Sequence, residues 1–329
     1  MSAHFRYAII GCGSVGLKRL NAIPKGRLAV ACDTNLDRAE RFVKLSASGC
    51  AMRDFRSAVR DDSVDIVIVS CINSLLAPVA SDALRAKKHV FIEKPAGVNS
   101  REIQGLMRLA DKHRRYVRVG FNHRFHPAIS KAYKLVRSGA IGKLMFVRGR
   151  YGHGGRLGYE KEWRMDPVRS GGGELIDQGV HLIDLARWFL GDFKVVEGFA
   201  GTYFWKSNVD DNAFLSLRTK ADKLAWLHVS WTEWKNLFSF EIYGRTGKLH
   251  VDGLGGSYGL ERLYYYKMLP QMGFPTTRVW AFRRLDDSWT KEIRFFEEDI
   301  SKSRKPKPGL TDALAAMRCV EATYKKSGF

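Results

Sequence analysis

The segment AIIGCGSVG at residues 8–16 constrains the fold more than any other part of this chain. Its glycines at positions 11, 13 and 16 form a GxGxxG pattern that follows an apolar run and opens a helix-like segment. Such glycines let a turn close tightly and let the backbone approach a pyrophosphate at the N-terminus of a helix. The segment therefore predicts a strand–turn–helix unit that binds a dinucleotide, with a tight turn that binds no ligand as the alternative.

Asp33 ends the second strand-like run, about twenty residues after Gly13, which is typical of the acidic residue in this kind of site. A carboxylate there accepts hydrogen bonds from the ribose hydroxyls and repels a 2′-phosphate. We therefore expect NAD as the cofactor. Arg38 lies close enough in the sequence to leave NADP open as the alternative.

The first third of the chain alternates short apolar runs with longer amphipathic stretches. Continuous apolar strands separated by helices indicate a parallel sheet that is covered on both faces. We predict strands at 5–11, 28–33, 65–71, 89–94 and 116–121, with helices at 14–23, 35–45, 77–86 and 100–113.

The pattern changes after a helix predicted at 127–137. Runs in which apolar and polar residues alternate indicate a mostly antiparallel sheet with one face that is either solvated or covered by a partner. These predicted strands lie at 144–151, 212–219, 224–231 and 237–244, residues 244–253 are predicted to form a turn followed by another strand, and a helix at about 174–190 interrupts the series. The predicted fold is α/β: a Rossmann dinucleotide-binding domain at 1–122, then an α+β domain for substrate binding and oligomerisation at 123–329. A helix at about 309–326 closes it.

The charge of the chain is unusual, because 55 Lys and Arg against 34 Asp and Glu give a net charge of +21. A positive field attracts nucleic acid, anionic lipid or an anionic small molecule, whatever the fold. The basic residues are dispersed and no nucleic-acid motif accompanies them, so nucleic-acid binding is a remote alternative. Five scattered cysteines without a CxxC pair, and no apolar stretch of about 18 residues, favour a cytoplasmic protein without a metal site or membrane span.

Lys94, in the segment FIEKPAG at residues 91–97, follows the fourth predicted strand. Ligands of open α/β sheets bind beyond the carboxyl ends of the strands, so we expect Lys94 near the cofactor. A solvated lysine with no task is the alternative.

The segment SGGGELIDQGVHLIDLARWFLG at 170–191 holds a carboxylate, Asp177, and an imidazole, His181, at a spacing of four residues. On a helix these two side chains lie on one face. The helix is apolar nearly all round, so the two groups must pair or line a cavity. A purely structural Asp–His pair is the alternative to a site.

A basic and aromatic segment precedes this helix. Arginine forks suit the recognition of carboxylates or phosphates, and a solvated charged loop is the alternative. The basic residues are Arg148, Arg150, His153, Arg156, Lys161, Arg164 and Arg169, interleaved with Tyr151, Tyr159 and Trp163. This segment and the net charge predict a substrate that carries a negative group.

Three motifs together resemble the Gfo/Idh/MocA oxidoreductases, a family that includes glucose–fructose oxidoreductase and inositol dehydrogenase. They are the GxGxxG, the EKP at 93–95, and GGGxLxDxGxHxxD at 171–184; GFNHRFHP at 120–127 and YGRTGKLHVDG at 243–253 extend the resemblance. The resemblance implies that Lys94 and His181 are the catalytic pair, with Asp177 as their acidic partner. An imidazole, with a pKa near about 6.5, suits removal of the hydroxyl proton, and the lysine would stabilise the charge on the oxygen.

We therefore predict the following contacts. Cofactor contacts come from Gly11, Cys12, Gly13, Ser14, Val15, Gly16, Asp33, Thr34, Arg38, Cys71, Asn73, Glu93, Lys94, Asn122, Trp163 and Arg164. Substrate contacts come from Lys94, Arg124, Tyr151, His153, Arg164, Asp177, Gln178 and His181.

The predicted function is NAD(P)-dependent hydride transfer to or from a ring secondary alcohol or ketone of a sugar, one that is anionic or nucleotide-linked. A cyclitol dehydrogenase is the alternative, and a dinucleotide-binding sensor without catalysis is a remote one. Aromatic residues in the second domain predict a homodimer or homotetramer formed through its sheet: Phe214, Trp226, Trp231, Trp234, Phe238 and Phe240.

Overall fold

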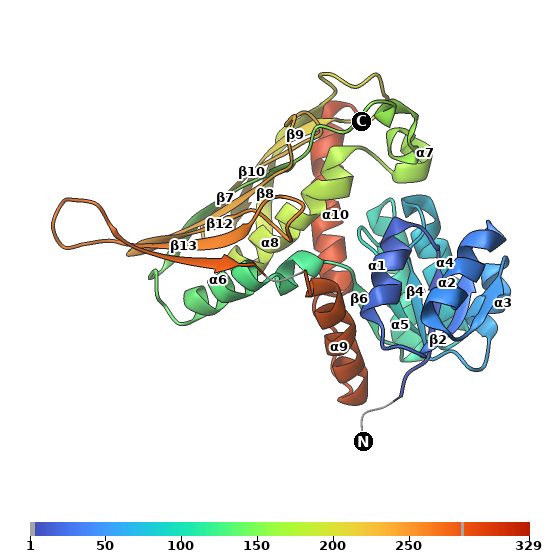
Figure 1. The fold of residues 1–329 in the computed structure, drawn as a ribbon. Coiled ribbons are helices and arrows are strands. Elements are labelled where there is room, and N and C mark those ends of the chain that lie inside the picture. Colours follow the sequence, from blue (N-terminus) through green and yellow to red (C-terminus); the bar gives the residue numbers. More distant parts are fainter. Residues whose placement is uncertain (1–3, 284–285) are drawn as a thin grey trace. The chain divides into compact units, whose positions relative to one another are not determined.

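The computed structural model describes residues 4–283 and 286–329, and the chain divides into two compact units. The first comprises Met1–Phe121, Val168–Gly171 and Trp289–Leu314; the second comprises Asn122–Pro167, Gly172–Ser288 and Ala315–Phe329 (Figure 1). Two segments that follow residue 122 in the chain therefore group with the N-terminal unit. The division of functions between 1–122 and 123–329 stays a prediction.

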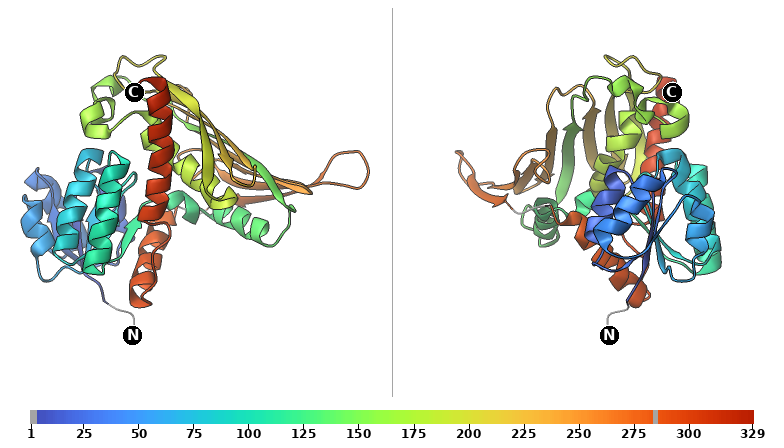
Figure 2. Two further views of the ribbon diagram at one scale, coloured as in Figure 1. Left: turned by 180° about the vertical axis from the view of Figure 1, so that it is seen from behind. Right: turned by 45° about the vertical axis from the view of Figure 1, so that its right-hand side comes forward.

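The first unit is built on a parallel sheet of six strands in the order β3-β2-β1-β4-β5-β6. Its central strands are buried on both faces, and Figure 2 shows helices on either side of the sheet. The predicted doubly covered parallel sheet is confirmed. The strands are β1 Tyr7–Ile10, β2 Leu28–Cys32, β3 Cys50–Met52, β4 Ile66–Val69, β5 His89–Ile92 and β6 Val117–Val119. The helices are α1 Ser14–Ala22, α2 Leu36–Ser46, α3 Phe55–Arg60, α4 Asn73–Arg85, α5 Ser100–His113 and α9 Ser288–Ser301.

Sequence reasoning missed β3, α3 and α9 and placed the start of α4 too late. β3 has three residues and is only partly buried, so it lacks the apolar run that marks the other strands. α4 begins at Asn73 and continues through Pro78, which lies inside the helix and donates no backbone hydrogen bond to it.

The second unit contains a sheet of eight strands in the order β14-β13-β12-β11-β7-β10-β9-β8. All neighbours are antiparallel except β7 and β10, which confirms the mostly antiparallel sheet. The strands are β7 Leu144–Gly152, β8 Phe193–Gly201, β9 Asn212–Thr219, β10 Leu224–Ser230, β11 Leu237–Gly244, β12 Gly247–Asp252, β13 Glu261–Lys267 and β14 Thr276–Phe282. The sequence analysis missed β8 and the hairpin β13–β14, whose exposed residues alternate less clearly.

Helices pack on one face of this sheet. The strand side chains that point away from these helices form its outer face. The helical elements of the second unit are η1 Asn122–Phe125, α6 Pro127–Arg137, η2 Tyr159–Lys161, η3 Trp163–Met165, η4 Leu175–Gly179, α8 Val180–Leu190 and the part of α10 Leu310–Ser327 that follows Leu314. All but the first residue of α7 Pro167–Ser170 groups with the first unit. Three aromatics expected at a subunit interface, Trp231, Phe238 and Phe240, are buried in the core, so that part of the prediction is wrong. Trp226, in contrast, is 53% exposed on the outer face.

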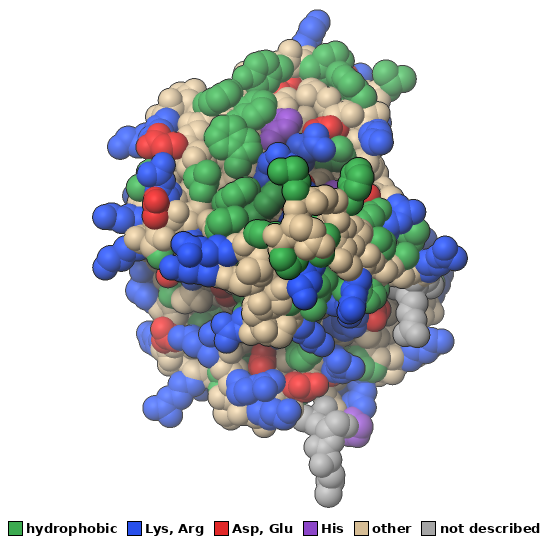
Figure 3. All heavy atoms as spheres, turned by 90° about the vertical axis from the view of Figure 1, so that its left-hand side faces the viewer, with side chains coloured by type: hydrophobic (Ala, Val, Ile, Leu, Met, Phe, Trp, Pro, Cys, Tyr) green, Lys and Arg blue, Asp and Glu red, His purple; other side chains and the backbone are tan. Residues whose placement is uncertain are grey.

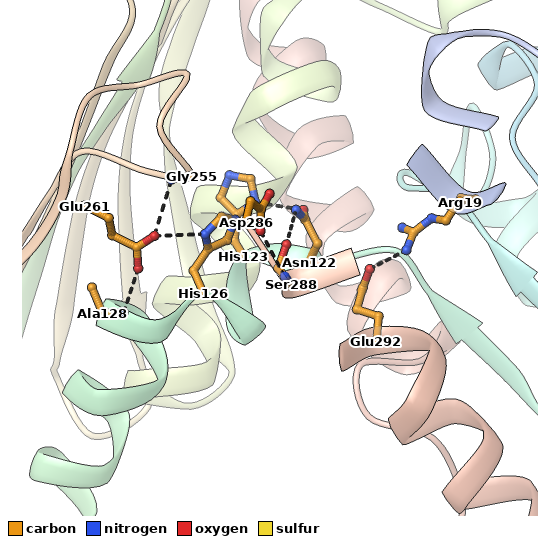
Figure 4. A network of polar contacts seen from close by, with 10 residues as sticks. All are labelled: Arg19, Asn122, His123, His126, Ala128, Gly255, Glu261, Asp286, Ser288 and Glu292. Atoms are coloured by element: carbon orange, nitrogen blue, oxygen red, sulfur yellow. Dashed lines mark hydrogen bonds and ion pairs between the residues drawn. The ribbon is translucent and has the colours of Figure 1, made fainter. Parts of the chain in front are cut away.

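A buried charged network joins α1, the end of β5 and α9 within the first unit. The guanidinium of the fully buried Arg19 donates to Glu93 at 2.6 Å and to Glu292 at 2.7 Å, the latter pair being drawn in Figure 4. The rings of Phe91 and Trp289 lie 4.1 and 4.3 Å from the guanidinium carbon. Such a network is tolerated inside a protein only because the charges meet each other.

In this network two carboxyl groups, those of Glu93 and Glu292, face one guanidinium group, that of Arg19. Burial raises the pKa of Glu292 to about 7, and Glu93 adds to this, although Arg19 acts in the opposite direction. Burial would lower the pKa of Arg19, but the two carboxylates raise it overall. Glu292 therefore changes its protonation near neutral pH while Arg19 stays charged.

We predict that this network makes stability fall as pH rises. A carboxyl group whose pKa is higher in the folded than in the unfolded state stabilises the fold fully at pH values below its unfolded-state pKa. This stabilisation is lost as the pH rises through the folded-state pKa, which for Glu292 means between about pH 4.5 and 7. The loss amounts to about 3 kcal/mol at most. In Glu292→Gln the decrease in the free energy of unfolding between pH 4.5 and 8 should be smaller by that amount, as measured by urea unfolding.

Glu298→Gln, on the outside of the same helix, is the matched control and should unfold with the wild-type pH dependence. Identical curves for Glu292→Gln and the wild type would show that Glu292 does not titrate in this range.

Candidate active site

The glycine loop after β1 has one packed side and one open position. A methyl group on Gly11, whose φ is +98°, would lie 2.6 Å from the Ser70 carbonyl oxygen, and one on Gly16 would collide with the Gly11 carbonyl. A methyl group on Gly13 would meet no atom of the described residues within 4 Å beyond its chain neighbours. The loop is therefore pressed against the sheet, while its Gly13 backbone is accessible at the N-terminus of α1.

Asp33 connects the end of β2 to this loop. One carboxylate oxygen accepts from the backbone N–H of Cys12 at 2.8 Å, and the other accepts from Asn35 at 2.9 Å. The side chain remains partly exposed, and Thr34 and Arg38 beside it are exposed. An accessible loop amide and a fixed carboxylate are the features that a pyrophosphate and a ribose require, so these residues fit a dinucleotide.

Two other predicted cofactor contacts have partners within the first unit. The Asn73 side chain donates to the Ser170 carbonyl at 2.8 Å, and the Glu93 carboxylate faces Arg19. Burial raises the pKa of the Cys71 thiol to about 12, so this side chain stays neutral. Contacts of these three side chains with the cofactor stay predictions.

Lys94 follows β5 and is partly exposed. Its peptide bond to Pro95 is cis. Gly120 has no side chain because a methyl group there would lie 2.8 Å from a Glu93 oxygen and 2.9 Å from the Arg19 guanidinium. The residue before Lys94 is thus held by a buried ion pair.

Asp177 and His181 belong to a helix that begins as a π turn. The helix expected at about 174–190 is present, and the structure adds that Leu175–Gly179 form a π turn that leads directly into α8. Single π turns inside helices are frequent at functional sites.

Asp210 fixes the start of this π turn. Its carboxylate accepts from the backbone N–H groups of Gly173 and Leu175, both at 2.8 Å, and from the Tyr324 hydroxyl at 2.6 Å. Methyl groups on Gly172 and Gly173 would overlap with Tyr324 and with the Asp210 backbone, which explains the glycine run. Burial raises the pKa of Asp210 to about 6, although the hydrogen bonds oppose this.

A second histidine, which the sequence analysis did not select, stacks on His181. The rings of His123 and His181 have centroids 3.8 Å apart and planes inclined by 14°. The Tyr151 ring lies edge-on to both, 5.2 Å from His123 and 6.4 Å from His181. The sequence could have pointed to His123 through its place in the segment GFNHRFHP at 120–127. Nothing in the sequence, however, shows that residue 123 lies beside residue 181.

Arg124 and Gln178, both predicted to contact substrate, are buried and have partners in the second unit. Arg124 donates to both carboxylate oxygens of Asp184, at 2.7 and 2.5 Å. Gln178 donates to the Tyr258 hydroxyl at 2.9 Å, and Tyr258 in turn packs against Tyr151. Tyr258, which the sequence analysis did not select, thus contacts two of the predicted substrate residues.

The segment before the helix brings Arg164 to the site residue Asp177. Arg164 donates to the Asp177 carboxylate at 3.1 Å and its guanidinium lies over the Trp163 ring. His153 accepts from the Gly155 backbone, and burial lowers its pKa, so it is neutral near pH 7. Arg164 and Asp177 therefore form one charged pair rather than two independent charges.

Most of the arginines that suggested an anionic substrate are engaged elsewhere. Arg148 pairs with Glu241 at 2.5 Å on the outer face of the sheet. Arg150, two residues further along β7, belongs to the same face. The inner face at this strand is formed by Gly149, against which Leu182 of α8 packs. Arg156 forms an exposed ion pair with Glu162. On the face that Figure 3 draws, Lys and Arg side chains are likewise spread out rather than gathered in one patch.

Within residues 4–283 and 286–329, no group of three or more His, Cys, Asp or Glu side chains is placed to hold a metal ion. Nor does any helix in these two ranges have the length and apolar character needed to cross a membrane.

A parallel sheet with a GxGxxG loop and an acidic residue after its second strand defines a dinucleotide-binding unit of the Rossmann type. Residues 5–121 match the model of the oxidoreductase family with an NAD-binding Rossmann fold. Residues 129–250 match the model of the GFO/IDH/MocA C-terminal domain. The chain belongs to the GFO/IDH/MocA family of oxidoreductases.

Relatives cover nearly the whole chain at low identity. The chain is 24% identical to the oxidoreductase YrbE of Bacillus subtilis, over 98% of this chain and 94% of that protein. It is also 24% identical to myo-inositol 2-dehydrogenase of Thermotoga maritima, over 95% and 93%. The solved structure of levoglucosan dehydrogenase in complex with NADH and levoglucosan matches with a TM-score of 0.89 at 20% identity, over 98% and 97%. This last match shows the fold.

We predict that Gly13→Ala weakens NAD binding without unfolding the chain. The added methyl group meets open space in the protein but occupies the position where a pyrophosphate would approach. The Kd for NAD, measured by calorimetry, should rise at least about tenfold, equivalent to ~1.4 kcal/mol.

Gly105→Ala adds the same methyl group on α5, where the nearest side-chain atom is 3.9 Å away, and should leave the Kd unchanged. Unaltered NAD affinity in Gly13→Ala would argue against cofactor binding at this loop.

Proposed function

We propose that this chain is an NAD-dependent dehydrogenase, or ketoreductase in the reverse direction, acting on a ring CH–OH group of a sugar or cyclitol. In the oxidation direction, bound NAD supplies the acceptor for the hydride that leaves the alcohol carbon. His181 accepts the hydroxyl proton, and Lys94 donates a hydrogen bond to the oxygen as negative charge develops on it. Asp177 orients the substrate and stabilises the protonated imidazole. The expected location is the cytoplasm.

The observation that carries this proposal is the π turn with its clamp. Asp210 and Tyr324 hold the start of the turn, and the turn carries Asp177 just before His181. A buried imidazole that directly follows a π turn is typical of a functional site, because single π turns inside helices are frequent there. Arg164 pairs with Asp177 and supports its ionised form.

The substrate class divides into two candidates. The net charge of +21 motivates an anionic or nucleotide-linked sugar. The pairing of Arg124, Arg148, Arg156 and Arg164 with carboxylates favours the second candidate, a neutral cyclitol or sugar, because paired guanidinium groups have less to offer a substrate anion.

A substrate panel separates these candidates. The protein is incubated with NAD and with inositols, neutral sugars, sugar acids and nucleotide sugars, and reduced cofactor is followed by absorbance. Turnover confined to neutral polyols would refute the anionic substrate, and turnover confined to acidic or nucleotide-linked sugars would refute the cyclitol.

We predict that Lys94→Met lowers kcat at least about 100-fold with the best substrate, the scale of losing one donor to a developing oxyanion. NAD affinity should stay within about threefold, because the lysine acts on the reacting oxygen. Lys112→Met on α5 is the control and should behave as wild type. Loss of NAD binding together with turnover would assign Lys94 a structural role, and an inactive wild type that binds NAD would favour a sensor.

We further propose that the outer face of the eight-stranded sheet binds a second copy of the chain. Trp226 lies in the middle of this face between Arg148 of β7 and Ser216 of β9. Burial opposes ionisation of Glu241, but hydrogen bonds from Arg148 and Lys248 lower its pKa to about 2, so its charge is neutralised locally. A face with exposed aromatics and neutralised charges suits a homodimer or homotetramer interface.

We predict that the wild type has a mass in solution that is a multiple of 37.3 kDa and that Trp226→Glu shifts it to a single chain. A carboxylate at the centre of an apolar interface is buried without a matched partner, which opposes association. Light scattering at micromolar concentration measures the mass. Leu45→Glu, at an exposed position on α2 of the first unit, should leave it unchanged, and a monomeric wild type would refute the interface.

A further inference from the structure

Two buried imidazoles of the second unit, His123 in η1 and His181 in α8, lie face to face. Their centroids are 3.8 Å apart and their planes differ by 14°. Both side chains are buried, so little water separates or screens them. A positive charge on one ring therefore acts directly on the other.

The ring of His123 is held in one orientation. Its Nδ1 lies 3.0 Å from the Asn122 side-chain oxygen, and the Asn122 amide nitrogen donates to the Ser288 hydroxyl at 3.2 Å, as Figure 4 shows. An amide oxygen only accepts, so His123 keeps a proton on Nδ1. The edges of the Tyr151 and Phe238 rings pack against it at 5.2 and 5.8 Å.

The other ionisable groups around the two rings come from five elements. From η1, Arg124 pairs with Asp184 of α8; His126, just after η1, pairs with Glu261 of β13, and Asp286 lies 3.9 Å from it. From η4, Asp177 pairs with Arg164, and the buried Glu174 directly precedes this turn. Burial raises the pKa of Tyr151 on β7 well above its ordinary value and that of Tyr258 to about 12, so both are neutral.

We infer that His123 and His181 titrate as one group that takes up a single proton, so that His123 leaves His181 neutral in a fraction of the molecules at acidic pH. Glu174 and Asp177 act electrostatically on Tyr151, whose ring contacts both imidazoles, and these carboxylates favour one positive charge on the stack. A second charge would lie against the first. The consequence for catalysis rests on the proposed role of His181 as the base. His123 is then a positioning residue that preserves a proton acceptor below neutral pH.

An NMR titration of the imidazole nitrogens in the full-length protein, without substrate, tests this inference. In the wild type both rings should shift with one shared midpoint, and above about pH 5 His181 should stop short of the full imidazolium shift. In His123→Phe, which keeps a flat stacking ring without a charge, His181 should reach the full shift.

Two complete protonation steps in the wild type would overturn the inference. So would a full shift of His181 while His123 stays unchanged. Because both outcomes are read in the wild type, a His123→Phe variant that fails to fold leaves the inference testable.

His228→Phe is the matched control. His228 stacks on Phe214 with centroids 4.3 Å apart on the outer face of the sheet, so its replacement should leave the His181 titration unaltered. The titration needs no turnover. A shared step in a protein that oxidises no alcohol of the panel would refute the proposed function and support this inference.

Kinetics add a second readout where a substrate is found. For each protein, kcat/KM at about pH 5.5 is divided by kcat/KM at about pH 8. This ratio should be at least about threefold higher in the wild type than in His123→Phe. Equal shares would show that the stack does not preserve the acceptor.

Discussion

The buried carboxylate of Asp210 is the interaction on which the geometry of the candidate site depends. It accepts hydrogen bonds from the N–H groups of Gly173 and Leu175, which stand at a helix start where backbone donors lack partners within the helix. The Tyr324 hydroxyl is its third donor. A buried carboxylate is tolerated only with such donors, so this acid, the glycine run and the π turn require one another. The turn then decides where Asp177 and His181 stand.

The first unit depends on a comparable buried charge. Arg19 of the helix that follows the glycine loop is held by Glu93, next to Lys94, and by Glu292 of α9. The cofactor loop and the strand end that carries Lys94 therefore share one ion-pair network, and the Gly120 backbone leaves the space for it. Because Asp210 and Glu292 both have raised pKa values, each unit contains an acid that titrates between acidic and neutral pH.

Sequence reasoning succeeded where a local rule has a single structural meaning. The GxGxxG loop, Asp33 and the apolar strands predicted the parallel sheet, because period and turn chemistry are local properties. It failed where structure depends on distant partners. β3 and β14 are partly or largely exposed, α9 buries Glu292 against a helix far away in the sequence, and the π turn exists because Asp210 and Tyr324 arrive from 37 and 151 residues beyond Gly173.

By itself the sequence determined the fold class, the NAD-binding loop and the residue types available for chemistry, since these follow from spacing and from what glycine, aspartate, lysine and histidine can do. Only the tertiary structure decided which charged side chains are available to bind a substrate. It turned Arg148 to the far face of the sheet, paired Arg124 with Asp184 and stacked His123 on His181. The physical reason is that charge, burial and ring stacking act over a few ångströms of space, and residues that lie far apart along the chain become neighbours only when the sheet and its helices have packed.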